Sequence, residues 1–359
     1  MITNKLKSIN KRLYPQKLFY GPGWIVLGVN NICNLHCKMC DVGIEYTASN
    51  FYQNLMGTSP LNMPMELIKI IFDQTAKFYP KTKIGYAFTE PLIYPYLIES
   101  LLYAKEKNLY TSFTTNALTL KQKVKDICKA GLNDIFISLD GPEEIHNQIR
   151  GHKNSFQKAI EGIDELLKHS QRPNISIFCV ITEWNIGHLK EFADYFKKFP
   201  LKQLGFMHTN FTPDFIVSNH NKIYGDKYPA TISNTEQIQI SKMNLKILLD
   251  EIREIKKTNY PFELTFSPEI KSEYDLDVFY NHPETLVGRI CNDVYRNIMI
   301  KSDGSVIPAH GRCYNLDIGN IYNNSLKEIW NSKVVSEFRK DLMNAGGLFP
   351  ACSRCCSAF

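Results

Sequence analysis

Between residues 24 and 210, short apolar segments alternate with longer segments of helical periodicity. We predict strands over residues 24–29, 84–88, 110–114, 134–139, 175–181 and 203–208. We predict helices over residues 65–78, 97–107, 121–130, 156–169 and 188–199. This alternation indicates parallel β/α units. Six units are too few for a closed eight-stranded barrel. We therefore predict that residues 21–210 form an α/β fold of the open, partial (β/α)6 TIM-like barrel type. Its active site is expected at the carboxyl ends of the strands.

Residues 1–20 form a basic segment ahead of the first strand. Their apolar side chains recur at helical spacing, at Ile2, Leu6, Ile9 and Leu13. We predict a helical extension packed on the barrel end, with a membrane-surface anchor as the alternative. No apolar run approaches the roughly 20 residues of a membrane span. No apolar stretch of signal-peptide length and no cleavage signal follows the basic segment, so we predict a cytoplasmic protein. The net charge of +6 is scattered, which does not favour a nucleic-acid partner.

The rest of the chain departs from this alternation. Residues 211–285 form a predicted loop and helical bridging region, with a long loop over 211–230 and a helix over 236–257. Residues 286–359 form a predicted small α+β domain rich in cysteine. A hairpin in this domain is expected to turn at Asp303-Gly304.

The ten cysteines are unevenly distributed. Three lie within residues 33–40 and five follow residue 290, which leaves only Cys128 and Cys179 between the two groups. Disulfides rarely persist in a reducing compartment. The uneven distribution therefore indicates metal ligation.

The first group, Cys33, Cys37 and Cys40, lies on the loop that follows the first predicted strand. Three thiolates can hold three irons of a [4Fe–4S] cluster and leave the fourth iron open. A zinc site is the alternative. It needs a fourth ligand, and His36 lies inside the loop with poor reach.

The spacing Cys-x3-Cys-x2-Cys after the first strand of a partial barrel resembles the signature of the radical S-adenosylmethionine (SAM) superfamily. The resemblance implies a [4Fe–4S] cluster on Cys33, Cys37 and Cys40 that binds SAM at its open iron. In such enzymes an electron cleaves SAM and releases a 5′-deoxyadenosyl radical, which abstracts a hydrogen atom from the substrate. The resemblance also implies an electron donor of the flavodoxin or ferredoxin type.

Further motifs at the strand ends strengthen the resemblance. Glu90 lies in the segment 87–91, which resembles the family's Gly-Gly-Glu-Pro motif without its glycines. The resemblance implies that Glu90 binds the methionyl amine of SAM. Ser138 and Arg150 resemble ligands of the SAM carboxylate, and Asn116 and Asn185 resemble other residues that surround the cofactor. Taken singly, several of these motifs are also ordinary turn sequences.

The second cysteine group resembles the auxiliary-cluster extension called SPASM or, in its shorter form, twitch. The shared features are the hairpin, a Gly-Asn-Ile run, a Ser-Leu-x-x-Ile-Trp helix and a final Cys-x2-Cys. The resemblance implies an auxiliary [4Fe–4S] cluster on Cys291, Cys313, Cys352 and Cys355, with Cys356 as a substitute for Cys355. A structural zinc at these cysteines is the alternative, because the final pair suits zinc equally.

Enzymes with these extensions oxidise alcohols, cross-link or epimerise peptides, and mature cofactors. The short segment before the first strand leaves no room for the leader-binding domain of many peptide-modifying members. We therefore predict oxidation of a small molecule, such as a sugar or aminocyclitol, with the auxiliary cluster as electron acceptor. A peptide maturase or a radical epimerase is the alternative. A non-catalytic, metal-stapled scaffold is the alternative from a different class.

Oxidation of an alcohol also requires a proton acceptor. The candidates are His208 and Asp140 at the strand ends and His310 beside the auxiliary site, although for each one the residue pattern favours an ordinary hydrogen-bonded structural role. Cys179 is a buried small residue in one interpretation and a hydrogen-atom donor for epimerisation in the other. The candidates for substrate contact are Tyr86 and Asn210.

Overall fold

The computed structural model describes residues 4–359, and Ile2 of the predicted extension lies outside them. One ten-stranded sheet runs in the order β10-β9-β8-β1-β2-β3-β4-β5-β6-β7. Its strands are β1 (Trp24–Leu27), β2 (Lys83–Tyr86), β3 (Thr111–Thr115), β4 (Asp134–Ser138), β5 (Asn174–Ile181), β6 (Gln203–His208), β7 (Glu263–Ser267), β8 (Asn297–Ile300), β9 (Ser305–Pro308) and β10 (Gly319–Asn320). Neighbouring strands are parallel from β8 through β1 to β7, and β8–β9 and β9–β10 are antiparallel.

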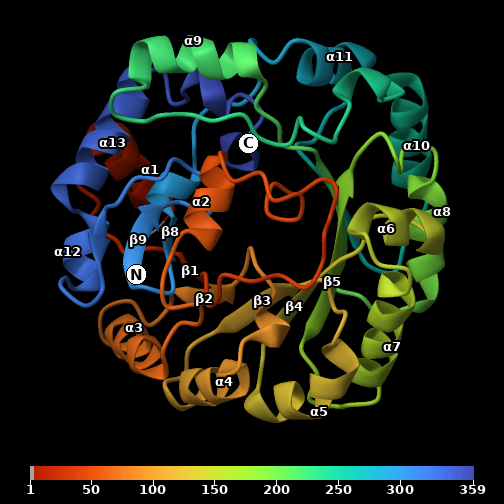
Figure 1. Cartoon of the computed structure of the whole chain (residues 1–359), viewed down its shortest axis with the longest axis horizontal. Helices are drawn as coiled ribbons and strands as arrows, with labels where there is room; N and C mark the ends of the chain where they lie inside the picture. Colours follow the sequence, from red (N-terminus) through yellow and green to blue (C-terminus); the bar gives the residue numbers. More distant parts are fainter. Residues whose placement is uncertain (1–3) are drawn as a thin grey trace.

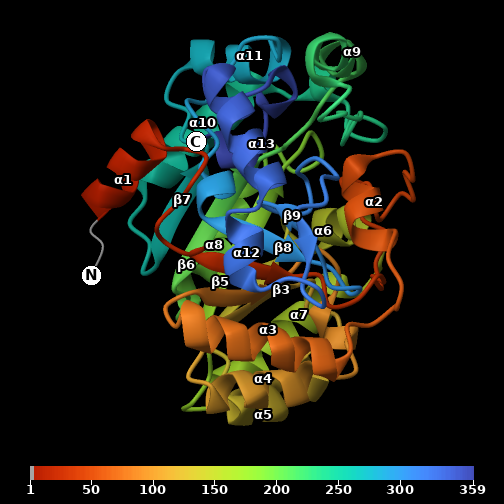
Figure 2. The ribbon, with the colours of Figure 1, turned by 90° about the vertical axis from the view of Figure 1, so that its left-hand side faces the viewer.

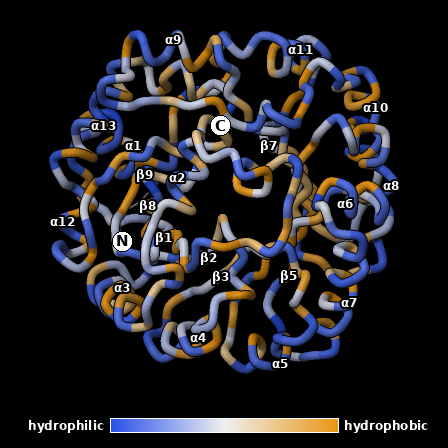
Figure 3. The backbone as a smooth tube through the Cα atoms, in the orientation of Figure 1, coloured by the Kyte–Doolittle hydropathy of each residue, from blue (hydrophilic) through white to orange (hydrophobic). Residues whose placement is uncertain are grey.

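Helices surround the curved sheet (Figure 1). The α-helices are α1 (Asn4–Leu13), α2 (Asn50–Met56), α3 (Met65–Phe78), α4 (Leu97–Glu106), α5 (Leu120–Ala130), α6 (Glu143–Arg150), α7 (Ser155–Leu167), α8 (Leu189–Tyr195), α9 (Asp214–Tyr224), α10 (Leu245–Lys257), α11 (Glu273–Asn281), α12 (Leu326–Trp330) and α13 (Lys333–Asn344). The outer helices alternate between hydrophilic and hydrophobic stretches (Figure 3), as expected for helices that bury one face.

The inner face of the sheet encloses a lumen. Trp24 on β1 and Phe136 on β4 have ring centroids 6.5 Å apart, although two strands lie between them. Phe136 also packs against Phe178 on β5, with centroids 5.7 Å apart. Rings on distant strands can meet only on the concave side of a curved sheet. Since successive residues of a strand point to opposite faces, residues of the other parity face the helices.

The sheet extends beyond the six predicted strands in both directions. β7 lies in the predicted bridging region and pairs with β6, and β8 joins the cysteine-rich segment to β1. Phe266 is the one buried residue among the five residues of β7. This explains why apolar periodicity did not reveal the strand. The C-terminal segment therefore continues the barrel sheet.

The segment after β6 also differs from the prediction. Helix α9 occupies most of the predicted loop over 211–230, directly after Pro213, and it buries only Ile216 and His220. The predicted helix over 236–257 begins at Leu245, because Asn244 caps it by accepting the backbone N–H of Ile247 at 3.1 Å.

Helix α1 lies at the periphery of the molecule (Figure 2). Asn10 is its one buried residue and donates to the carbonyl of Lys17 at 2.9 Å. Ile9 and Leu13 remain 39% and 55% exposed, so the apolar stripe is largely uncovered. Among residues 4–359, no helix combines the length and apolar character of a membrane span.

Candidate functional site

The first cysteine loop packs against the end of α6. Lys38 donates its backbone N–H to the carbonyl of Ile149 at 2.9 Å. Gly151, just after α6, has a φ of 67°, and a Cβ there would come within 2.8 Å of the carbonyl oxygen of His36. Only glycine permits this approach. The contact brings Arg150 onto the cysteine loop.

The three thiols of this loop lie near one another. Cys37 is buried, and Cys33 and Cys40 are half-buried. Burial raises the pKa of Cys33 to about 11 and that of Cys37 to about 12, and Cys40 contributes to both increases. Iron binding would displace these protons, because the thiolate is the metal ligand.

Arg150 supplies a buried positive charge beside the thiols. Its Nη1 lies 3.7 Å from Sγ of Cys37, and its Nε donates to Oδ2 of Asp140 at 2.5 Å. Burial alone would lower the pKa of Arg150, but Asp140 and Cys37 raise it, so the guanidinium stays charged. Oδ1 of Asp140 accepts the backbone N–H of Val180 at 2.9 Å. Asp140 is thus fixed as a charge partner of Arg150 and is poorly placed to accept a proton.

Glu90 supplies a buried carboxylate on the other side of the loop. Its Oε1 accepts from Oγ1 of Thr115 at 2.7 Å and from the backbone N–H of Leu92 at 2.9 Å. Its Oε2 accepts the backbone N–H of Asn116 at 2.8 Å. Burial raises the pKa of Glu90, and these three donors oppose the increase. The side chain of Asn116 donates to Asn34 of the cysteine loop at 2.8 Å, which ties the end of β3 to that loop.

The remaining predicted cofactor contacts differ in placement. Ser138 ends β4, is half-buried and shares the parity of Phe136, so it faces the lumen. Asn185 is fully buried, and its side-chain amide donates to the carbonyl oxygens of Asp140 at 3.0 Å and Val180 at 2.7 Å. This geometry gives Asn185 a role in holding the strand ends together.

Three predicted reaction residues lie on the helix-facing side of the sheet. Nδ1 of His208 lies 2.8 Å from the hydroxyl of Tyr280 on α11. Cys179 is fully buried, with Sγ 3.6 Å from the amide nitrogen of Asn185. Tyr86 donates its hydroxyl to Ser100 on α4 at 2.9 Å. Since these side chains point away from the lumen, their placement favours packing roles over the predicted contacts with substrate.

The C-terminal cysteines surround a cavity of about 80 Å³, large enough for several waters. Asn210 and His310 also border it, whereas the exposed Cys356 does not. The cysteines that line the cavity are Cys291, Cys313, Cys352 and Cys355. Burial raises the pKa of Cys291, and the other three thiols raise it further. This donor set fits an iron–sulfur cluster held by four thiolates.

Sulfur spacing separates a cluster from a single zinc ion at both sites. Thiolates on one zinc lie about 2.3 Å from the metal, which places their sulfurs within about 4 Å of one another. Across residues 4–359, only one group of three His, Cys, Asp or Glu residues has its ligand atoms within 4.8 Å of one another. This group is His310, Cys355 and Cys356. Both predicted cysteine sets are more widely spaced than a single ion requires. The spacing therefore fits clusters better than zinc.

Two contacts connect the cysteine sites. Asp41, next to Cys40, accepts the hydroxyl of Ser233 at 2.6 Å, and Nη1 of Arg312, next to Cys313, lies 3.5 Å from the same hydroxyl. In addition, the rings of Phe88 and His310 stack with centroids 5.8 Å apart. The two sites thus border one region at the carboxyl ends of the strands.

This connection between the two sites was not predicted from the sequence. Asp41 is completely buried, and Arg312 lies with its guanidinium 4.1 Å from the ring centroid of Phe51. The available signal was a charged residue directly beside a cysteine ligand in each group. No local pattern marked Ser233, which joins the two charges from a distant part of the chain.

The two sites differ in what they leave open. A three-thiol loop leaves one iron of a cluster free for a small charged ligand, and a four-thiol cavity leaves none. Together with the open parallel sheet, they define the class of two-centre iron–sulfur enzymes on a partial β/α barrel.

Family comparisons identify the group within this class. Residues 28–196 match the radical SAM superfamily, and residues 291–356 match the iron–sulfur cluster-binding domain SPASM. The chain belongs to the radical SAM superfamily and carries a C-terminal SPASM-type domain. Its cofactors are a SAM-binding [4Fe–4S] cluster, SAM and an auxiliary cluster.

Sequence relatives share only part of the chain. The GTP 3′,8-cyclase of Helicobacter pylori strain HPAG1 is 27% identical over 197 residues, which are 54% of this chain and 58% of the relative. The Fe-coproporphyrin III synthase of Methanosarcina barkeri is 20% identical over 241 residues, which are 67% of this chain and 54% of the relative. The chain thus spans little more than half the length of these relatives.

Solved structures share the fold over most of the chain. Streptococcus suis SuiB bound to precursor peptide SuiA has a TM-score of 0.62 at 15% identity, over 97% of this chain and 75% of SuiB. The protein anSMEcpe with bound AdoMet has a TM-score of 0.61 at 19% identity, over 88% of this chain and 83% of that protein. At such low identity, the similarity shows the fold alone.

Proposed function

We propose that this enzyme oxidises a small-molecule alcohol, such as a sugar or aminocyclitol, by two electrons. SAM at the first cluster supplies the 5′-deoxyadenosyl radical for this chemistry. In the balanced reaction, carbon loses a hydrogen atom that forms 5′-deoxyadenosine, the hydroxyl loses a proton, and one electron goes to the auxiliary cluster. A carbonyl replaces the alcohol.

Charged side chains hold the cofactor in this proposal. Glu90 offers a carboxylate to the methionyl amine, and Arg150 offers a guanidinium to the methionyl carboxylate, beside the hydroxyl of Ser138. Charge-assisted hydrogen bonds in a buried site are strong and directional.

The observation that carries the proposal is the direct connection between the two cysteine sites. Ser233 lies between the charges of Asp41 and Arg312, and each of these is adjacent to a cysteine. Phe88, two residues before Glu90, stacks on His310 at the edge of the auxiliary cavity. A substrate bound over Glu90 and Arg150 would lie beside the auxiliary site, as an electron acceptor requires.

The test uses anaerobically reconstituted, full-length protein with about eight irons per chain. It is incubated with reductant, SAM and a panel of sugars and aminocyclitols, and products are measured by mass spectrometry. We expect a product lighter by two hydrogens and one 5′-deoxyadenosine per product. A product of unchanged mass would instead indicate a redox-neutral reaction.

The matched variant is Cys291→Ala, which removes an auxiliary ligand and leaves the first site intact. We expect this variant to form 5′-deoxyadenosine while it loses the oxidised product. Undiminished formation of the oxidised product by Cys291→Ala would rule out the auxiliary site as electron acceptor.

A further inference from the structure

Arg312 lies between the two cysteine sites, is half-buried and has no ion-pair partner. Among residues 4–359, the arginines with a carboxylate oxygen within 4.0 Å of a guanidinium nitrogen are Arg150 and Arg253. In the same part of the chain, the one hydrogen-bond contact of the Arg312 guanidinium joins Nη1 to the hydroxyl oxygen of Ser233 at 3.5 Å. A guanidinium carries several N–H donors, so most of those of Arg312 have no protein acceptor.

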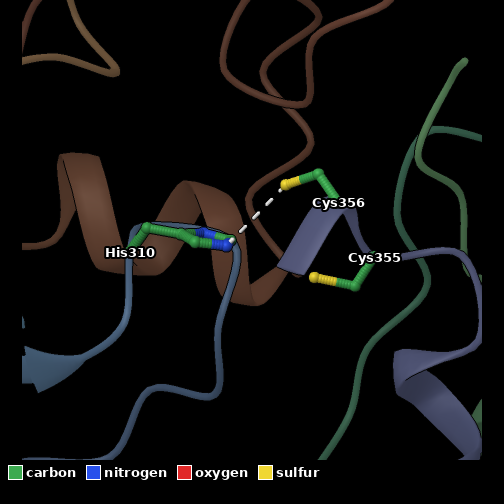
Figure 4. Close-up of side chains that lie close together, drawn as sticks. All are labelled: His310, Cys355 and Cys356. Atoms are coloured by element: carbon green, nitrogen blue, oxygen red, sulfur yellow. Dashed lines mark hydrogen bonds between the residues drawn. The ribbon is translucent and has the colours of Figure 1, made fainter. Parts of the chain in front are cut away.

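The backbone of Arg312 is fixed at the auxiliary site. Nδ1 of His310 accepts the backbone N–H of Arg312 at 3.2 Å. The same ring points toward the side chains of Cys355 and Cys356 (Figure 4). The residue after Arg312 is Cys313, which lines the auxiliary cavity together with Arg312 itself. The Arg312 side chain therefore starts at the edge of this cavity.

From this edge the side chain of Arg312 extends toward the first site. Its guanidinium carbon lies 4.1 Å from the ring centroid of Phe51 on α2. Phe51 packs edge-on against Phe88, with ring centroids 6.0 Å apart. Phe88 lies two residues before Glu90, the proposed partner of the SAM amine. The guanidinium is thus held on an aromatic ring between the auxiliary cavity and the site proposed for SAM.

The nearby carboxylate of Asp41 does not neutralise Arg312 directly. Both oxygens of Asp41 accept hydrogens from uncharged groups. Oδ2 accepts the hydroxyl of Ser233 at 2.6 Å, and Oδ1 accepts the backbone N–H of Asn234 at 3.0 Å. Ser233 therefore stands between the two charges and leaves the guanidinium free to bind another anion.

Two further hydrogen-bond donors line the same cavity as Arg312. Oγ1 of Thr231 accepts the backbone N–H of Asn50 at 2.7 Å, which leaves the hydroxyl hydrogen of Thr231 without an acceptor among residues 4–359. Asn210 accepts the amide of Asn234 through its backbone carbonyl, so within the described chain its side-chain amide has no partner. A guanidinium and neutral donors, with no carboxylate in the described lining, suit a bound oxyanion.

We propose that Arg312 binds an oxyanion of the substrate, either a phosphate or a carboxylate. The inference rests on the proposed function and narrows it, because the substrate is then an acidic sugar and not a cationic aminocyclitol. The planar fork of arginine matches the geometry of both oxyanions. An anion bound at Arg312 places the rest of the substrate between Glu90 and the auxiliary cavity.

The test measures anion binding without turnover. Full-length, anaerobically reconstituted protein with SAM is titrated with inorganic phosphate and, separately, with acetate, by isothermal titration calorimetry at constant ionic strength. We expect saturable binding of at least one anion, weakened about ten- to a hundredfold in Arg312→Gln. Arg312→Lys keeps the charge but not the fork, so a smaller loss is expected. Arg253→Gln, at an exposed arginine on α10, is the control and should bind as wild type does.

The anion that binds more tightly distinguishes a phosphate from a carboxylate. No saturable binding of either anion by wild type would overturn the proposal, and so would equal binding by Arg312→Gln. A shift in the auxiliary midpoint potential of Arg312→Gln with unchanged anion binding would assign Arg312 to the cluster instead. Oxidation of a neutral or cationic sugar with the same KM in Arg312→Gln and wild type would also overturn the proposal, while the proposed oxidation would stand. Because the titration uses no reductant, failure of the oxidation leaves it valid.

Discussion

The two cysteine sites differ in the charged side chains that surround them. The first places Glu90 and the Arg150–Asp140 pair beside three thiols, and all three charged side chains are buried. Among residues 4–359, no carboxylate lines the second site. Its charged lining residues are Arg312 and Arg354, and the guanidinium of Arg354 donates to backbone carbonyls. The hydroxyl of Tyr314 lies 3.5 Å from Sγ of Cys352. Buried charge is costly unless it is paired. Buried charges of both signs lie together at the first site, which suits a small molecule that itself carries both charges, whereas the four thiols of the second site need only to enclose its cluster.

The sharpest test of this comparison is Cys37→Ala. Cys37 is the buried thiol of the first loop and lies beside Arg150, so its loss should abolish 5′-deoxyadenosine formation entirely. The auxiliary site should keep about half of the iron and sulfide. Product is followed by liquid chromatography and metal by elemental analysis. Cys128→Ala, at a buried thiol on α5 outside both sites, is the control. Persistent SAM cleavage in Cys37→Ala would break the assignment.

The complementary change is Cys352→Ala at the auxiliary site. We expect it to lose the other half of the iron and to leave SAM cleavage near the wild-type rate, because no side chain of the first site changes. Cys356→Ala should retain all of the iron, since Cys356 does not line the cavity. If Cys356→Ala loses iron while Cys355→Ala keeps it, the ligand assignment of these two cysteines must be exchanged.

The first site was more predictable from sequence than the second because its determinants are local. The spacing of Cys33, Cys37 and Cys40 lies within one loop, and Glu90 and Arg150 follow recognisable strand and helix ends. By contrast, the choice between Cys355 and Cys356 depends on contacts with His310, more than forty residues away in the chain. Local spacing cannot decide which of two adjacent side chains faces a cavity.

Strand parity limited the prediction of reaction residues. The bounds of β6 were predicted correctly at both ends, yet His208 faces α11 and its neighbour Met207 has the parity of the lumen. One residue of register exchanges the two faces of a strand. Continuously apolar strands, such as that around Cys179, carry no alternation from which the face could be read.

A smaller effect is expected from Arg150→Met, which leaves Asp140 buried without its cation. Breaking a buried ion pair in this way costs roughly 3–5 kcal/mol, measured as the free energy of unfolding in urea. Binding of radiolabelled SAM should also be lost. At the auxiliary site, Tyr314→Phe removes one uncharged contact and should cost only about 0.5–1.5 kcal/mol. Similar costs at the two sites would remove the electrostatic contrast.

An internal control for the Arg150 prediction comes from the double variant Arg150→Met/Asp140→Leu. It removes the charge that Arg150→Met leaves uncompensated, so stability should recover in part while SAM binding stays lost. If the stability of the double variant does not recover, the single variant disrupts packing more than charge.

The smallest effect tests whether burial keeps His208 uncharged, outside both cysteine sites. Burial, with a contribution from Lys256, lowers the pKa of His208 from 6.5 to about 3. Between these values the unfolded chain binds a proton that the native protein does not, so stability falls as the pH decreases from 6.5. His208→Asn, which retains a polar group facing Tyr280, should reduce this dependence by up to about 1.4 kcal/mol per pH unit. Urea unfolding at pH 7, 6 and 5 measures it, with the exposed His188→Asn as the matched control. An identical pH dependence in His208→Asn and wild type would show that His208 gains a proton in the native protein and that burial does not keep it uncharged.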